Sequence, residues 1–220
     1  MIESISISDL KRMVTEAAHR LRDEHEFLSQ LDCIAGDGDH GVTMLRVSEH
    51  LEAAARQSSA PDLETFLTDC GWRILSIDGG ASSALFGTFL LGMAEASGDG
   101  NFTCGSLAVA FESGRNALLK QTLARPGDKT MVDALVPAVD AVHAAAETGI
   151  PIPAALKHAA AAAHAGAEST KSLVARYGRA KYSGEKTLGH ADAGAVSIAF
   201  IFDGFSKACA PPKETNDGRS

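Results

Sequence analysis

Residues 8–29 read SDLKRMVTEAAHRLRDEHEFLS, and this stretch sets the pattern on which the fold prediction depends. Ser8 is a suitable N-cap residue, because its side chain can accept a hydrogen bond from a free amide of the first turn. Apolar side chains then recur every three or four residues, at Leu10, Met13, Val14, Ala17, Leu21 and Leu28. This spacing predicts a helix with one buried face.

Seven further stretches are typical of helices, and no stretch alternates convincingly with the period of two of a strand. Range 196–202 is apolar enough for a buried strand, but its flanks favour a helix. The other helices are expected at 42–56, 62–76, 81–96, 104–123, 131–147, 152–175 and 193–208. We therefore predict an all-α protein, an eight-helix antiparallel up-down barrel or bundle with its binding site at one end.

The composition fits a single domain over residues 1–209, followed by a disordered tail, 210–220, that reads APPKETNDGRS. Hydrophobic residues make up 45% of the chain but aromatic residues only 5%, and alanine is abundant. Small side chains let helices approach one another closely. The sequence therefore predicts a core of tightly packed helices.

The net charge of −8 argues against nucleic acid as a partner, because a phosphate backbone requires a basic face. No signal peptide is evident at the start, and the alanine-rich range 154–167 is too short and too polar to span a membrane. The four cysteines are scattered, which favours free thiols in a reducing compartment. We expect a cytoplasmic protein with no membrane or nucleic-acid partner.

Four loops gather at one end of the predicted bundle. Consecutive helices run in opposite directions, so the loops after the first, third, fifth and seventh helices emerge together. These loops are 31–41, 77–81, 124–130 and 176–192. They hold nearly all of the sequence that is rich in glycine, aspartate and lysine, whereas the opposite loops carry nothing comparable. The functional site is therefore expected at this end.

Asp32, Asp37 and Asp39 fall close together in the first of these loops, interrupted by glycines. Glycine lets such a loop fold tightly, and three adjacent carboxylates repel one another unless a cation neutralises them. Hard oxygen ligands select Mg²⁺ or Ca²⁺, and magnesium commonly completes its shell with phosphates and water. The alternative is a pair of Asp-Gly turns with solvated charges.

Two similar motifs do not fit this loop. The range 36–41 formally matches GxGxxG, but the dinucleotide-binding version follows a strand and offers bare amides to pyrophosphate. This loop follows a helix and would direct carboxylates at the phosphate, which requires a metal between them. An EF-hand starting at Asp37 would need glycine at Val42 and glutamate at Ser48, and the sequence has neither.

The other three loops supply groups that suit a nucleotide. The sequence GGASS, 79–83, leads into a helix, whose first amides and hydroxyls can receive phosphate. Met131 follows GDKT at another helix start and can pack on a purine ring. Arg179 can pair with phosphate, and Asp192 opens the last helix. Each signal alone also fits ordinary helix capping, and it is their shared end of the bundle that favours a site.

Four blocks resemble signature sequences of the L domain of dihydroxyacetone kinases, the nucleotide-binding part of these enzymes. They are GDGDHG (36–41), GGASS (79–83), PGDKTMVDAL (126–135) and GEKTLGHADAGAVS (184–197). The resemblance extends over residues 8–209. It implies an eight-helix barrel with ADP or ATP at one end, a kinase that is active only with a separate ketose-binding K subunit, and a homodimer or hetero-oligomer.

The resemblance also implies the ligand contacts. Asp32, Asp37 and Asp39 would hold two Mg²⁺ ions that bridge the phosphates. Arg179 and the metals are the candidates for catalysis, and the general base would belong to the partner. The residues expected to line the nucleotide are His40, Gly41, Val42, Thr43, Ala81, Ser82, Thr130, Met131, Arg179, Asp192, Ala193 and Gly194.

Two departures from the family pattern bear on the phosphoryl donor. Thr43 replaces an asparagine and Ala193 a proline, so each removes a contact or a restraint. Both changes predict weaker closure over the nucleotide and a divergent branch that uses ATP, with dihydroxyacetone, erythrulose or another ketose as acceptor. Two alternatives remain: ADP as a permanent cofactor rephosphorylated by a phosphocarrier protein, and a non-catalytic regulatory protein.

Overall fold

The computed structural model describes residues 3–98 and 100–210, so the predicted tail lies outside the described residues apart from Ala210. Helices dominate the described part, as predicted, and the only β-type pairing in it is an isolated bridge between Ile5 and Phe102. The α-helices are α1 (Ile7–Asp23), α2 (His25–Ala35), α3 (His40–Gln57), α4 (Leu63–Leu75), α5 (Gly80–Glu95), α6 (Cys104–Lys120), α7 (Val132–Glu147), α8 (Ile152–Ser169) and α9 (Ala193–Cys209).

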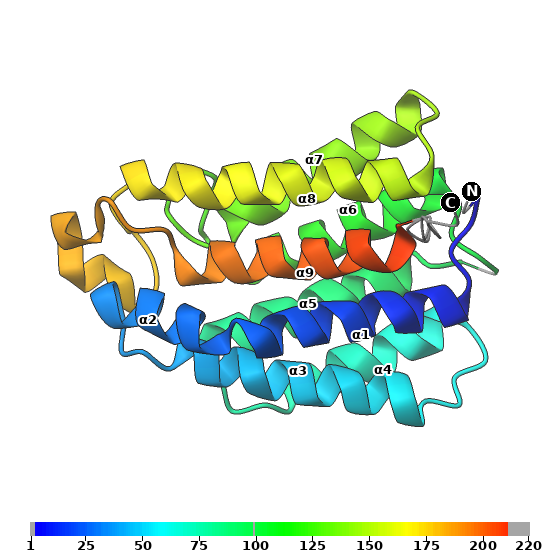
Figure 1. The fold of residues 1–220 in the computed structure, drawn as a ribbon, viewed down its shortest axis with the longest axis horizontal. Coiled ribbons are helices and arrows are strands. Elements are labelled where there is room, and N and C mark those ends of the chain that lie inside the picture. The colour runs from blue at the N-terminus through cyan, green and yellow to red at the C-terminus, as the bar shows by residue number, and fades with distance from the viewer. Residues whose placement is uncertain (1–2, 99, 211–220) are drawn as a thin grey trace, which may run out of the picture.

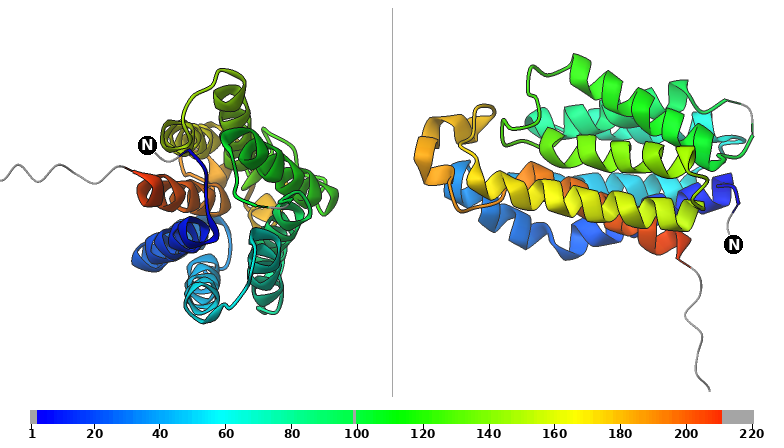
Figure 2. Two further views of the ribbon diagram at one scale, coloured as in Figure 1. Left: turned by 90° about the vertical axis from the view of Figure 1, so that its right-hand side faces the viewer. Right: turned by 90° about the horizontal axis from the view of Figure 1, so that it is seen from above.

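Eight of these helices, α1 and α3 to α9, form a closed ring in which each packs against the next along the chain (Figure 1). The last helix, α9, packs against α1 and closes the ring, which the end-on view of Figure 2 shows. Successive helices run in opposite directions. The predicted eight-helix up-down barrel is confirmed, and α2 is an additional short helix at one end.

The ring is filled by aromatic side chains in one part and closed by small ones in another. Phe111 of α6 lies 6.1 Å from Phe89 of α5 and 5.5 Å from Phe202 of α9, measured between ring centroids. Because α6 and α9 are not neighbours in the ring, these rings meet across its interior. Alanines pack α7 closely against α8, and the buried set includes Ala134, Ala138, Ala155, Ala159 and Ala163.

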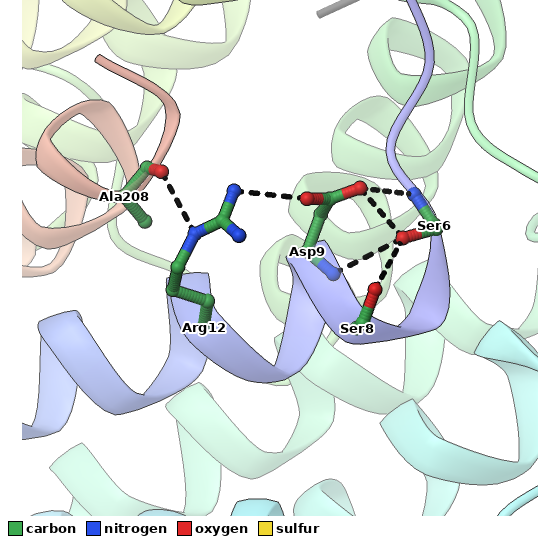
Figure 3. A network of polar contacts seen from close by, with 5 residues as sticks. All are labelled: Ser6, Ser8, Asp9, Arg12 and Ala208. Carbon is green, nitrogen blue, oxygen red and sulfur yellow. Dashed lines mark hydrogen bonds and ion pairs between the residues drawn. The ribbon is translucent and has the colours of Figure 1, made fainter. Parts of the chain in front are cut away.

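The first helix begins at a capping box whose residues are drawn in Figure 3. Ser6, not the expected Ser8, is the N-cap: its hydroxyl accepts from the Asp9 amide, and the Asp9 carboxylate accepts from the Ser6 amide at 3.0 Å. Arg12 then pairs with Asp9 at 2.9 Å and donates to the carbonyl of Ala208 at 3.0 Å. These bonds join the start of α1 to the end of α9.

Two expected helix boundaries are wrong. The stretch 8–29 is broken at Glu24, and its second part continues as α2 to Ala35, so Asp32 lies in a helix and not in a loop. The apolar stripe continues past the break to Leu28, so periodicity alone could not reveal it. The stretch 152–175 ends as an α-helix at Ser169, and two 3-10 segments follow, η1 (Thr170–Ser172) and η2 (Arg179–Thr187).

None of the helices in the described part of the chain is long and apolar enough to cross a lipid bilayer.

Close backbone contact between α1 and α9 depends on Gly204. A Cβ atom there would lie 2.3 Å from both the amide nitrogen and the Cα of Ala17. We predict that Gly204→Ala lowers the free energy of unfolding by about 1–3 kcal/mol, because overpacking outweighs the better helix propensity of alanine. Gly105→Ala, at an exposed position of α6 with open space around it, should instead raise stability slightly. Urea denaturation of both variants measures the difference, and equal behaviour would contradict the packing argument.

Candidate functional site

The four loops singled out in the sequence do meet at one end of the ring, around a cavity of about 410 Å³. In Figure 1 this is the end at which α2 and the orange segment before α9 lie, opposite the start of α1 and the end of α9. Residues from all four loops line the cavity, together with residues from the ends of the adjoining helices. The up-down order of the helices therefore accounts for the position of the site.

Asp32, Asp37 and Asp39 form a compact carboxylate cluster on the wall of this cavity. One side-chain oxygen of each lies within 4.8 Å of the others. Asp32 lies in the last turn of α2, whereas Asp37 and Asp39 lie in the short connection to α3. Oxygen ligands at this spacing suit a hard divalent cation such as Mg²⁺, which the chemistry of the donor set favours over softer metals.

The connection that carries two of these aspartates turns at Gly38, which has a φ of 78°. A Cβ atom there would lie 2.5 Å from the Cys33 sulfur on α2, so the loop lies directly against the helix. This contact brings Asp37 and Asp39 back towards Asp32.

Arg179 brings a positive charge to the cluster from a distant part of the sequence. It is the first residue of η2 and follows Gly178, whose φ is 64°. Its guanidinium forms ion pairs with Asp37 and, at 3.1 Å, with Asp39. All three side chains are more than two-fifths exposed, so solvent screens the pairs and the contact can be exchanged for another charged group.

His40 begins α3 directly behind the carboxylates. Only 7% of its surface is exposed, and its two ring nitrogens lie 3.2 Å from the Ser82 hydroxyl and 3.3 Å from the Ser197 hydroxyl. Burial lowers the pKa of His40 to about 4, although the nearby Asp32 carboxylate acts in the opposite direction. The imidazole is therefore neutral at pH 7. It connects α3, α5 and α9 by hydrogen bonds and does not supply a positive charge.

Two helices that start at the site, α3 and α5, lack the side-chain caps present at α1, α4 and α6, whereas α9, which also starts at the site, is capped by Asp192. At the far end, α1, α4 and α6 are capped by side chains of Ser6, Asp62 and Thr103. At the site, α3 and α5 begin at Asp39 and Gly79 without a side-chain cap. The first amide of α3, that of His40, donates to the Asp32 carboxylate at 3.3 Å, whereas the first amides of α5 receive no capping side chain from Gly79. The positive end of each helix dipole favours an anion such as phosphate.

The buried carboxylate of Asp133 stabilises the turn 127–131 by hydrogen bonds. This carboxylate accepts from the amides of Gly127 at 2.6 Å and Thr130 at 2.8 Å. Thr130 and Met131 consequently reach the cavity wall. Lys129, which precedes Thr130 in the turn, is buried, and its ammonium donates to the carbonyls of Thr170 and His190.

Asp192 closes the site at the start of α9. Its carboxylate accepts from the Ala195 amide at 2.8 Å and caps the helix, while its own amide donates to the Thr170 hydroxyl. Burial raises the pKa of Asp192 to about 7, against the effects of the Ala195 hydrogen bond and the Lys129 ammonium. Ala193 and Gly194 follow on the cavity wall.

The structure brings together most of the residues expected at the site. All three aspartates line the cavity, as do His40, Ala81, Ser82, Thr130, Met131, Arg179, Asp192, Ala193 and Gly194. Gly41, Val42 and Thr43 do not line it. Gly41 lies against the backbone of α2, Val42 is exposed, and the Thr43 methyl packs on Gly79. Their positions on α3 place these three residues off the cavity wall.

Several residues of the cavity wall were not predicted from the sequence. Leu85 lies one turn after Ala81 on α5, so helical spacing could have found it. Ala124 and Tyr177 come from irregular segments where no periodic signal exists, and Thr122 lies beyond the end of α6, inside a range that was predicted to be helical up to residue 123. Lys129 lies within a block singled out above, but its spacing gives no indication that it is buried. Leu85, Ala124 and Met131 make part of the wall apolar, which suits the base of a nucleotide.

A model of the DAK2 domain matches residues 34–207. The chain belongs to the DAK2 domain family. It is 37% identical over 203 residues to the PEP-dependent dihydroxyacetone kinase, ADP-binding subunit DhaL, of Escherichia coli, covering 90% of this chain and 95% of that protein. The resemblance to dihydroxyacetone kinase L subunits seen in the sequence is thus confirmed.

Longer kinases contain a region similar to this DAK2 chain. L-erythrulose kinase of Pectobacterium atrosepticum is 37% identical over 185 residues, which are 81% of this chain and 31% of that enzyme. The crystal structure of the dihydroxyacetone kinase from C. freundii in complex with AMP-PNP and Mg²⁺ matches with a TM-score of 0.70 and 26% identity. The match covers 90% of this chain and 33% of that one, so the chain spans about a third of these enzymes.

The pKa values of His40 and Asp192 affect stability in opposite directions. Between about pH 4 and the ordinary histidine value of 6.5, folded His40 binds fewer protons than the unfolded chain, so its contribution to stability is lost as the pH falls. Asp192 has a raised pKa and binds more protons when folded between 3.8 and about 7, so its contribution rises as the pH falls. The two effects largely cancel.

Asp192→Asn should therefore make stability depend more strongly on pH. From pH 6.5 to 4.5 we expect the variant to lose roughly 2 kcal/mol of unfolding free energy relative to the wild-type protein, since one pKa unit corresponds to about 1.4 kcal/mol. Urea denaturation without metal at several pH values measures this. Asp78→Asn, an exposed change in the loop before α5, should follow the wild-type curve. Parallel curves for Asp192→Asn and wild type would contradict the prediction.

Proposed function

We propose that this chain is the nucleotide-binding, phosphoryl-donor subunit of a dihydroxyacetone-type kinase that acts on a short-chain ketose. The observation that carries the proposal is that three clustered carboxylates and the uncapped starts of α3 and α5 lie at the same cavity. Such a cavity suits a polyphosphate bound through a divalent cation. The match to an ADP-binding subunit along almost its whole length supports the same assignment.

Asp32, Asp37 and Asp39 would hold Mg²⁺, and we propose two ions because three carboxylates exceed what one phosphate-bound magnesium requires. The metal supplies neutralisation of phosphate charge when it is bound. Arg179, already at the rim of the cluster, is suited to stabilise the charge of the transferred phosphoryl group. Ser82 and the first amides of α5 would position the phosphates, and Met131 and Leu85 would contact the base.

The names of the relatives favour a phosphocarrier protein as the phosphoryl donor, which was the first alternative to ATP in the sequence-based prediction. In this version ADP stays bound and is rephosphorylated by a phosphocarrier protein that derives its phosphate from phosphoenolpyruvate. The support is that the relative matched over 95% of its length is named a PEP-dependent ADP-binding subunit. ATP as donor, expected from Thr43 and Ala193, is the second candidate, supported by the AMP-PNP complex of a longer kinase.

A K subunit that binds the ketose is part of the proposal. The chain corresponds to about a third of the longer kinases, so their remaining length would supply the ketose site. The described walls of the cavity, partly apolar and partly formed by carboxylates, suit a nucleotide and its metal and not a ketose. Whether the ketose is dihydroxyacetone or erythrulose would therefore be decided by the partner.

Asp37→Asn and Asp39→Asn should each abolish magnesium-dependent ADP binding while the helical circular dichroism persists. We expect affinity to fall beyond the roughly 10–100-fold that loss of an outer-shell partner causes, since a direct ligand is removed. Isothermal titration with ADP and Mg²⁺ measures the loss, and Asp78→Asn serves as the control at the same end of the ring. Near-normal ADP affinity in either aspartate variant would show that the cluster does not hold the metal.

The state of the purified protein distinguishes the two donors. A cofactor ADP must survive many turnovers, so we expect nearly stoichiometric ADP that resists dialysis in Mg²⁺ and is released by a chelator. Nucleotide analysis of acid extracts before and after dialysis measures this. Readily lost nucleotide, together with ketose phosphorylation when the chain, a K subunit and ATP are mixed, would instead favour ATP as the donor. Turnover by the isolated chain would refute the two-subunit arrangement.

A further inference from the structure

Lys129 combines two features that are rarely found together in a lysine. Of the residues that the structure describes, it is the only non-glycine residue with a positive φ, at 61°. Only 3% of its surface is exposed, although Lys129, like Thr130 and Met131, belongs to the wall of the cavity. Left-handed backbone is unfavourable for a residue with a side chain, and burial of an ammonium is unfavourable without partners. The side chain must make contacts that offset both costs.

Those contacts join two distant points of the chain. The ammonium donates to the carbonyl of Thr170 at 2.5 Å and to that of His190 at 2.6 Å. Thr170 follows the last turn of α8, and His190 precedes the N-cap of α9. Between them lies segment 171–189, which carries η2 and Arg179. One side chain thus fastens both ends of the segment that delivers Arg179 to the carboxylates.

Further bonds run between the two ends of this segment. The Gly189 amide donates to the Lys171 carbonyl at 2.8 Å, and the Asp192 amide to the Thr170 hydroxyl at 2.8 Å. Asp128, the residue before Lys129, accepts from the Arg176 amide at 3.2 Å through its carbonyl. The turn 127–130 therefore supports both ends of segment 171–189, and Lys129 is its central contact.

We propose that Lys129 is a positioning residue, whose ammonium holds the two ends of segment 171–189 together and so keeps Arg179 over the carboxylate cluster. Only the expected effect of Lys129 on ADP dissociation rests on the proposed function. Two of the three ammonium protons are committed to backbone carbonyls, which leaves the charge near the cavity but fixes its place. Asp192 and Asp133 provide the opposite charge nearby.

Two variants separate the side chain from the backbone turn. Lys129→Met keeps most of the aliphatic volume but removes the charge and the donors. Lys129→Gly also removes the side chain, yet it suits the positive φ, so the turn itself is not strained. Lys157→Met, at an exposed position of α8, is the matched control.

Amide hydrogen exchange without nucleotide is the first measurement. In both Lys129 variants the amides of Arg176, Gly189 and Asp192 should exchange about tenfold faster or more, because two charge-assisted hydrogen bonds are lost. Amides inside α4, α5 and α6 should keep their protection, and the control should match wild type throughout. Unchanged exchange at the three amides would overturn the proposal, as would a uniform increase across all helices, which would indicate a general structural role.

The second measurement is the dissociation rate of ADP in Mg²⁺. It should rise about tenfold in Lys129→Met and in Arg179→Ala, and the double variant should add little, because both changes act through the same contact. Additive effects would mean that Lys129 acts independently of Arg179 and would overturn the proposal. If the wild-type chain binds no ADP, the proposed function fails, whereas the exchange experiment still decides the role of Lys129.

Discussion

Repulsion among Asp32, Asp37 and Asp39 is the constraint around which this end of the molecule is built. Their oxygens lie within 4.8 Å of one another, close enough for like charges to destabilise the fold unless positive charge compensates. The compensation available in the protein is Arg179, from a segment far along the chain, together with the uncapped starts of α3 and α5. Both are exposed or ligand-accessible, so a bound cation and phosphate can take over their role.

The ring of helices makes this concentration of charge possible without disturbing the core. Because the chain reverses at every helix of the ring, the four loops rich in glycine, aspartate and lysine emerge at one end, and the capped starts of α1, α4 and α6 lie at the other. Phe111 and its neighbours fill the ring interior and do not line the cavity. Stability and ligand binding are therefore assigned to different parts of the same helices, and a change at Asp37 leaves the contact between α1 and α9 intact.

Local pattern was sufficient for the fold class and for the location of the site, and the resemblance to the L domain supplied most of the individual wall residues. Helical periodicity gave the eight ring helices, and the order of the loops gave the location of the cavity. Local pattern failed where the outcome depends on tertiary contacts. The break at Glu24 interrupts no apolar stripe. Gly41 lies against α2, and the Thr43 methyl packs on Gly79, so neither reaches the cavity. The burial of Lys129 depends on carbonyls of Thr170 and His190, which no spacing reveals.

The contacts at the two ends of η2 differ in strength, so the two ends are not equally easy to displace. Near its start, Arg179 is 62% exposed, so its ion pairs are screened and readily exchanged. At the other end, Thr187 is buried and its hydroxyl accepts from the Ala175 amide at 3.1 Å, so the backbone there is held by bonds shielded from water. Displacement of this segment is therefore easiest at Arg179. Under the proposed function, a cation bound with the nucleotide would compete with Arg179 for the aspartates and would free its guanidinium to bind phosphate.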